Sequence, residues 1–161
     1  MSFKSQVNVS LGWNWNQGAV DNGRLDFAAQ FLDGGDAPAN GVWKAKDQLL
    51  AAANSVTLDL TALTNPILGG TLTVNFAAVK AVLVVNRGGG TLTVGGAAGN
   101  EWSAPFASPG DQFVVPADSP WLLVNSQSGW PVDAAHRNLK LAASGGDVTY
   151  SIVIVGDLAA V

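Results

Sequence analysis

The sequence contains no cysteine, which excludes a disulfide framework, a thiolate zinc site and a cysteine nucleophile. It has a single histidine, His136, so a metal site built from several histidines is also excluded. Charged residues make up only 12% of the 161 residues, about half the roughly 25% of ordinary soluble domains. The formal net charge is −4, and the chain therefore lacks the basic composition with which proteins bind DNA or RNA.

The shortage of charge predicts a surface that neighbouring subunits cover. Asn, Ser, Thr, Gln and Gly supply the polar surface instead, and they form hydrogen bonds without the large desolvation cost of a buried charge. The cores of protein interfaces are depleted in charged residues in the same way. A neutral but monomeric secreted domain is the alternative, and we favour the assembly.

Nothing in the sequence predicts a targeting or membrane segment. The first six residues lack the apolar core of a signal peptide. The longest apolar run, residues 77–85, is interrupted by Lys80 and is far shorter than the ~20 residues that span a bilayer. We therefore expect neither a membrane nor a nucleic acid among the partners of this chain.

Residues 1–50 differ from the rest of the chain because glycine and asparagine interrupt any periodicity. Residues 25–32 are compatible with a short helix or an irregular wrap, and residues 33–38 are typical of a turn. Residues 44–53 have a helix-forming composition without a strong apolar stripe. We interpret residues 1–50 as an arm of loops with an N-terminal strand and one short helix, and residues 51–161 as a sandwich, within a single domain.

Beyond residue 55 the pattern is that of β-structure. Short segments of apolar and β-branched residues, several of them alternating with polar ones, are separated at roughly ten-residue spacing by turns rich in Gly, Pro and Asn. No amphipathic helical segments alternate with them, which disfavours a βαβ fold. We predict an all-β fold, an antiparallel β-sandwich of jelly-roll or Greek-key type. The expected strands cover residues 56–60, 72–76, 79–85, 91–94, 112–116, 121–124, 138–142 and 148–155.

Residues 79–85 are almost continuously apolar and rich in valine, which predicts a central strand covered on both faces. The glycines at 88–90 predict a tight turn into residues 91–94. We therefore expect these two strands to form a hairpin.

The sequence gives little support for a catalytic or a metal-binding site. A serine triad around His136 lacks the spacing of a nucleophile elbow, and we interpret His136 as a surface or interface residue. A glycosidase needs two opposed carboxylates, and the only glutamate, Glu101, could face Asp59 or Asp111. Aspartates near turns usually cap them. Residues 33–36 lack EF-hand spacing. We therefore expect no enzymatic activity, no cofactor and no metal.

Six tryptophans carry the one serious ligand hypothesis. Trp13 and Trp15 would share a face if their segment is a strand, and two such rings could stack on a sugar. A glycan site needs two coplanar rings open to solvent. The alternative, which we favour, is that the rings fill the core or anchor a subunit contact. The candidates for contact with a partner or a glycan are Trp13, Trp15, Trp43, Trp102 and Trp130.

Several segments together carry a family resemblance: VKAVLVVN at 79–86, TLTVGG at 91–96, WSAPF at 102–106, NLKL at 138–141 and YSIVIVG at 150–156. In their order and turn composition they resemble small β-sandwich structural proteins of tailed-bacteriophage virions, which decorate or cement a capsid. The resemblance covers roughly residues 56–156 and does not extend to residues 1–55.

The resemblance implies a non-enzymatic homo-oligomer, a trimer or dimer, within a virion assembled in the host cytoplasm. Its partners would be the major capsid protein or other virion subunits. A cement protein binds across joints between capsid subunits and stabilises the shell by linkage. The N-terminal segment is then the candidate arm that reaches a neighbour, for example by strand addition. The alternative function is a carbohydrate-binding or tail-associated receptor-binding module.

Overall fold

The computed structural model describes residues 3–16, 20–32, 39–67 and 70–160, and within them it contains strands and turns but no helix. The predicted all-β class is confirmed. In chain order the strands are β1 (Lys4–Asn16), β2 (Val20–Leu32), β3 (Gly41–Leu50), β4 (Ser55–Asp59), β5 (Leu63–Ile67), β6 (Gly70–Val74), β7 (Phe76–Asn86), β8 (Thr91–Gly95), β9 (Gln112–Val115), β10 (Ser119–Val124), β11 (Trp130–Pro131), β12 (Asn138–Ser144) and β13 (Val148–Leu158).

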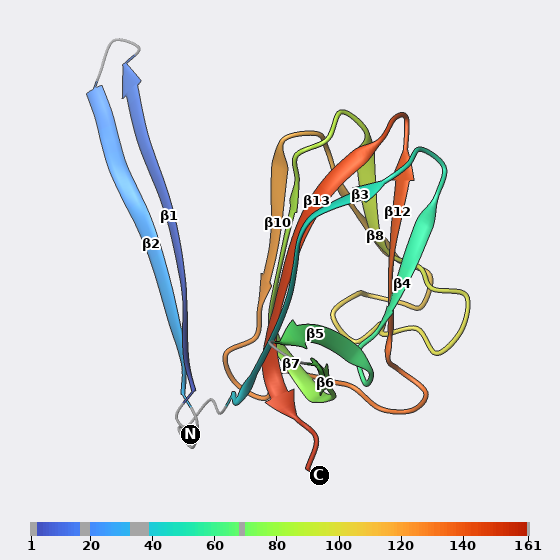
Figure 1. Ribbon diagram of the computed structural model, residues 1–161. Helices are drawn as coiled ribbons and strands as arrows, with labels where there is room; N and C mark the ends of the chain where they lie inside the picture. The colour runs from blue at the N-terminus through green and yellow to red at the C-terminus, as the bar shows by residue number, and fades with distance from the viewer. Residues whose placement is uncertain (1–2, 17–19, 33–38, 68–69, 161) are drawn as a thin grey trace.

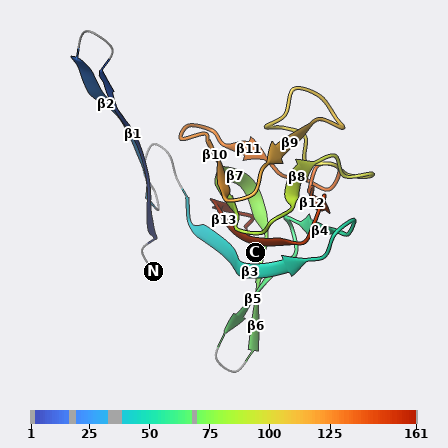
Figure 2. The same ribbon diagram turned by 90° about the horizontal axis from the view of Figure 1, so that it is seen from above.

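Two antiparallel sheets pack against each other in the main body, as Figures 1 and 2 show. The first sheet has the order β10-β7-β13-β3, with β11 paired to β7, and the second has the order β4-β12-β8-β9. Side chains alternate between the two faces of a strand. In β12, for example, Leu139, Leu141 and Ala143 are buried between the sheets. A single core thus fills the space between the sheets, as expected for a β-sandwich.

The predicted hairpin between residues 79–85 and 91–94 is wrong. Strand β7 belongs to the first sheet and β8 to the second, so the glycines between them carry the chain from one sheet to the other. A Cβ added at Gly88 would lie 2.5 Å from the backbone nitrogen of Thr149, and one at Gly90 would collide with the carbonyl of Gly146. Bare glycines are therefore needed here because the chain passes directly against the β12–β13 turn.

The predicted short helix at residues 25–32 is also wrong, because these residues form part of β2. Strands β1 and β2 pair along their entire lengths as a long hairpin that extends away from the sandwich (Figure 1). Leu25, Phe27, Ala29 and Phe31 occupy every second position of β2, which is the period of a strand. The pair Ala28–Ala29 conceals this alternation in the sequence.

The sandwich begins earlier than residue 51, since Gly41–Leu50 forms the edge strand β3 of the first sheet. Pairing with β13 overrides the helix-forming composition of this segment. Trp43 and Ala45 point into the core, whereas Val42 and Lys44 point outward. The turn predicted at residues 33–38 lies outside the described residues.

Candidate interaction surface

The β1–β2 hairpin, which we call the arm, has one apolar and one polar face. Its register places Val9 opposite Phe27 and Leu11 opposite Leu25. Residues directly opposite each other project from the same face of an antiparallel pair, so these side chains form one continuous surface. The other face is mostly polar, although Ala28 and Leu32 also lie on it; its polar side chains include Gln6, Asn8, Ser10, Asn14, Arg24 and Asp26.

The distal half of the apolar face is open to solvent. Leu11 is 65% exposed and Leu25 is 67% exposed, although both are large aliphatic side chains. A two-stranded hairpin is at best marginally stable in water, and a contiguous exposed apolar patch marks an interaction site. We call this patch the apolar arm face, and it consists of Val9, Leu11, Trp13, Leu25 and Phe27.

The proximal half of the same face packs on the body of the protein. Ala29 and Phe31 of β2 are buried against Ala81 of β7 and Val155 of β13. Val7 of β1 joins this cluster at its edge. The arm is thus anchored by the side chains that continue its apolar face toward the body, while the distal half extends beyond the contact (Figure 2).

Part of the outer surface of the first sheet is apolar, like its inner surface, although Lys44 and Ser151 also lie on the outer side. Leu122, Leu83 and Val153 form a row across β10, β7 and β13, on the side that faces the arm. Leu83 is 37% exposed and Val42, on the neighbouring edge strand, is 42% exposed. We call this surface the outer sheet face, and it consists of Val42, Ala81, Leu83, Leu122, Val153 and Val155.

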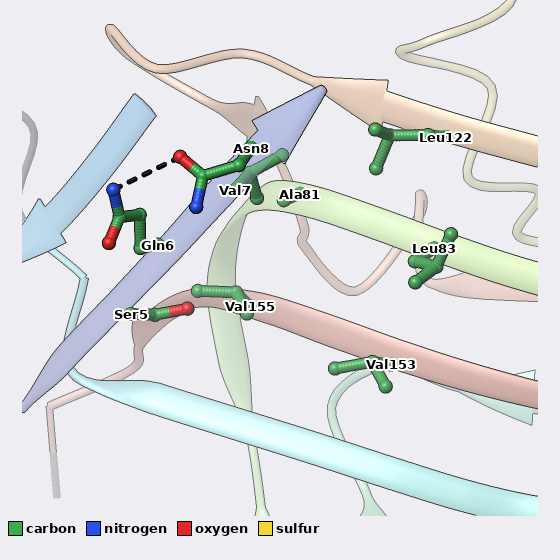
Figure 3. A pocket seen from close by; sticks show the side chains of 9 residues that line it. All are labelled: Ser5, Gln6, Val7, Asn8, Ala81, Leu83, Leu122, Val153 and Val155. Atoms are coloured by element: carbon green, nitrogen blue, oxygen red, sulfur yellow. Dashed lines mark hydrogen bonds between the residues drawn. The ribbon is translucent and has the colours of Figure 1, made fainter. Parts of the chain in front are cut away.

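A groove of about 310 Å³ separates β1 from the outer sheet face. Figure 3 shows β1 crossing above the sheet, with Val7 close to Ala81 and with Leu83 and Leu122 farther along the sheet. None of the groove's lining residues carries a charge; they are Ser5, Gln6, Val7, Asn8, Ala81, Leu83, Leu122, Val153 and Val155. Charged ligands therefore have no counter-charge in this groove.

The polar face of the arm carries its own internal contacts. Arg24 forms an exposed ion pair with Asp26, with an N···O distance of 2.6 Å. The hydrogen bond from Arg24 lowers the pKa of the Asp26 carboxyl, with a further contribution from Ser10. The amide of Gln6 donates to the side-chain oxygen of Asn8 at 3.0 Å. These groups satisfy one another on the solvent side and leave the apolar face free for a partner.

The tryptophans are divided between the core and the arm. The Trp102 ring is fully buried, and its N–H donates to the carbonyl of Pro131 at 3.0 Å. Trp43 is buried as well and donates to the carbonyl of Thr64 at 2.9 Å. The half-buried Trp130 meets Trp102 edge to face, with ring centroids 6.2 Å apart. These three rings therefore belong to the core and do not form an open contact surface.

Trp13 lies on the apolar arm face and is 45% exposed. Its ring covers Gly23, the residue opposite it on β2, because a Cβ added at Gly23 would collide with that ring. The side chain of Trp15 lies outside the part of the structure that is described. Of the sequence candidates for surface contact, the structure thus places Trp13 where a partner can reach it.

The candidate catalytic carboxylates stabilise turns. Glu101 accepts hydrogen bonds from the backbone N–H groups of Gly96 and Gly110, at 2.8 and 2.7 Å. Asp111 accepts one from the N–H of Ser108 at 2.8 Å. Asp59 accepts one from the N–H of Thr61 at 2.9 Å. Each carboxylate is thus held by local backbone donors, the capping role that aspartates near turns usually have.

His136 lies on an exposed loop, with its Nδ1 atom 3.1 Å from the Asp133 carboxylate. The hydrogen bond from His136 lowers the pKa of Asp133, as does the bond from the N–H of Ala135. Among the described residues, no three His, Asp or Glu side chains gather as a metal site would require. No helix long and apolar enough to cross a membrane is found in the same residues.

An aromatic cluster at the end of β9 was not predicted from the sequence. The Phe113 ring lies 5.1 Å from that of Trp121 and 5.6 Å from that of Phe106. Phe113 is partly exposed, whereas Phe106 and Trp121 pack against the core. The cluster therefore covers one end of the core and offers one exposed ring, without a second open ring beside it.

The interaction surface itself was only partly foreseen. The exposed leucines of the arm and Phe27 were not among the candidates, although alternation in residues 5–13 and 23–31 is visible once the two segments are aligned in opposite directions. Comparisons of the chain with protein-family models, curated proteins and solved structures found no match. Function is therefore inferred from the arm and the outer sheet face.

Proposed function

We propose that this chain is a non-enzymatic structural subunit of a larger assembly, and that the assembly is the virion of a tailed bacteriophage. The observation that carries the proposal is the apolar arm face, which extends from the body and has no partner within the described chain. The low charge of the sequence and its resemblance to capsid decoration proteins support the same conclusion.

The proposed role is to bind across joints between capsid subunits and to stabilise the shell. A bridge of this kind adds binding free energy only in the assembled state, so it shifts the equilibrium toward the intact shell. Many copies around one shell increase the total effect through avidity. The partners in this role are the major capsid protein or other virion subunits, together with further copies of this chain.

The test uses empty capsids purified from the phage that encodes this chain. The purified protein is mixed with these capsids and sedimented, and the decorated particles are imaged by electron microscopy. We expect the protein to pellet with the capsids and to give density over the subunit joints. If the protein stays in the supernatant, and an antibody against it does not label intact virions, the proposal is wrong.

A carbohydrate-binding or tail-associated receptor-binding module is the second candidate, because Trp13 presents an aromatic ring on an exposed hairpin. Aromatic rings of this kind bury large apolar areas in recognition sites. A glycan array with the intact protein and with Trp13→Ala distinguishes the two functions. Binding that the substitution abolishes supports the glycan module, whereas an array without binding supports the structural role.

A further inference from the structure

We infer that the apolar arm face of one copy of this chain docks on the outer sheet face of a second copy. The inference deepens the proposed function, since it identifies the first contact from which a multi-copy assembly is built. Unlike attachment to a capsid, this contact requires only the chain itself. It can therefore be tested on the purified protein alone.

The chain already contains a small version of this contact. Phe31 and Ala29, on the proximal part of the arm's apolar face, are buried against Ala81 and Val155 of the outer sheet face. The residues of the apolar arm face lie on the same side of the hairpin as Ala29 and Phe31, nearer its tip. Leu83 and Leu122 lie on the same side of the sheet as Ala81 and Val155. The inferred interface between two copies would therefore have the same kind of apolar contact that already joins the arm to the sheet within one copy.

The two exposed surfaces also match in size and in charge. From Val9 to Trp13 the arm spans about 13 Å at about 3.3 Å per residue, and four sheet strands spaced about 4.8 Å apart span about 14 Å. The side chains of the apolar arm face and of the outer sheet face are uncharged, and Lys44 of the edge strand β3 lies beside the outer sheet face, opposite Val153. Because Lys44 is on the edge strand, its ammonium group can stay in water when the surfaces meet.

One arm-to-sheet contact covers both surfaces, whereas packing of two arms against each other leaves the outer sheet face open. The groove beside Leu83 also gives the incoming side chains a space to fill. Each copy donates one arm and offers one sheet face. In a reciprocal pair or a closed ring of three copies, every arm face and every outer sheet face is therefore covered, and no free surface remains on which further copies could add.

The absence of native cysteines allows a direct test by disulfide trapping. Leu11→Cys is introduced into a tagged copy and Leu83→Cys into an untagged copy, and the two are mixed and oxidised. We expect a mixed disulfide between the two copies. Leu72→Cys, at an exposed leucine of β6, replaces Leu83→Cys as the matched control and should not cross-link. A Leu11→Cys protein that instead cross-links to itself shows arm-to-arm packing and overturns the inference.

Association of the full-length protein gives an independent measurement. Sedimentation of Leu11→Asn, Leu25→Asn or Leu83→Asn should show association at least about tenfold weaker, because each substitution removes a buried leucine from the interface. Val114→Asn, at an exposed aliphatic residue of β9 in the second sheet, is the matched control and should leave association unchanged. Circular dichroism verifies that each variant is folded.

The results separate this inference from the proposed function. A wild-type protein that remains a 16.5 kDa monomer at high concentration overturns the arm-to-sheet contact, whether or not it binds capsids. If the protein forms the mixed disulfide but does not pellet with capsids, the arm-to-sheet contact is supported and the proposed capsid role is wrong.

Discussion

The side-chain amide of Asn86 donates a hydrogen bond to the backbone carbonyl of Val115, with an N···O distance of 3.1 Å. Asn86 ends β7 in the first sheet, and Val115 ends β9 in the second. The same buried amide nitrogen also lies 2.8 Å from the carbonyl of Gly90 and 3.0 Å from that of Pro116. One side chain therefore joins the two sheets at the point where the chain passes between them.

Replacement of Asn86 by alanine should lower the free energy of unfolding by about 2–4 kcal/mol. The buried carbonyls that accept from its amide would be left without a donor, and each such unsatisfied group costs about 1–3 kcal/mol. Urea unfolding monitored by tryptophan fluorescence measures the effect. Asn75→Ala is the matched control, since Asn75 is exposed and should change stability by less than about 0.5 kcal/mol. Equal effects of the two substitutions would contradict the structural role of Asn86.

This crossing explains why the sequence predicted the strands better than their partners. Most strands after residue 55 are predicted because their alternation is local, and β12 and β13 show it clearly. The sequence missed β5 and β11, and the predicted strand at residues 72–76 is divided between the end of β6 and the start of β7. The glycines at 88–90 are equally compatible with a hairpin and with a passage between sheets. The passage between sheets is distinguished from a hairpin by the hydrogen bonds that the Asn86 side chain donates to the carbonyls of residues 115 and 116. These acceptors lie about thirty positions after Asn86 in the sequence, so no local pattern reveals them.

The arm could be predicted as an extension but not as a two-stranded hairpin. Its strands contain Gly12 and Gly23, which weaken a local strand signal, and the alternation emerges only when β1 and β2 are aligned. Exposure depends on what covers a side chain in three dimensions. For that reason nothing in the local sequence distinguishes the buried Phe31 from the exposed Phe27 on the same strand face.

The passage between the sheets also gives a prediction for its glycines. Gly90→Ala should destabilise the protein by more than about 2 kcal/mol, because its Cβ would collide with the backbone of Gly146 and the two segments would have to separate. Gly89→Ala is the control, because a Cβ there meets open space and the substitution should be neutral or slightly stabilising. Thermal unfolding of both variants measures the difference, and similar melting temperatures would show that the passage is not tightly packed.

Asp157 should make the protein less stable as the pH rises. Its carboxylate lies 3.9 Å from the ammonium group of the buried Lys80. Burial raises the pKa of Asp157, and the charge of Lys80 opposes this shift without cancelling it. A group with a raised folded-state pKa contributes stability that is complete below its unfolded pKa and is lost as the pH rises through the folded value.

The comparison that isolates this effect is between the wild type and Asp157→Asn, which does not titrate. The free energy of unfolding of the wild type, minus that of the variant, should decrease as the pH rises above about 4, the usual pKa of an aspartate. Chemical denaturation at a series of pH values measures this difference. A difference that grows with pH would mean that attraction to Lys80 outweighs burial, and that the pKa of Asp157 is lowered in the folded protein.

The backbone hydrogen bonds of the distal arm should report whether the apolar arm face is covered. Within the described part of the chain, strands β1 and β2 pair only with each other, and an isolated hairpin is marginally stable in water. In dilute protein the amides of residues 9–13 should therefore exchange with deuterium much faster than those of β7, which lies between β10 and β13.

At high concentration a partner stabilises the hairpin, so exchange of these arm amides should slow while that of β7 stays unchanged. Leu25→Asn should abolish the concentration dependence, because it removes a central side chain of the apolar arm face, and Val114→Asn on the second sheet should retain it. Fast arm exchange at every concentration would show that other copies of the chain do not cover this face.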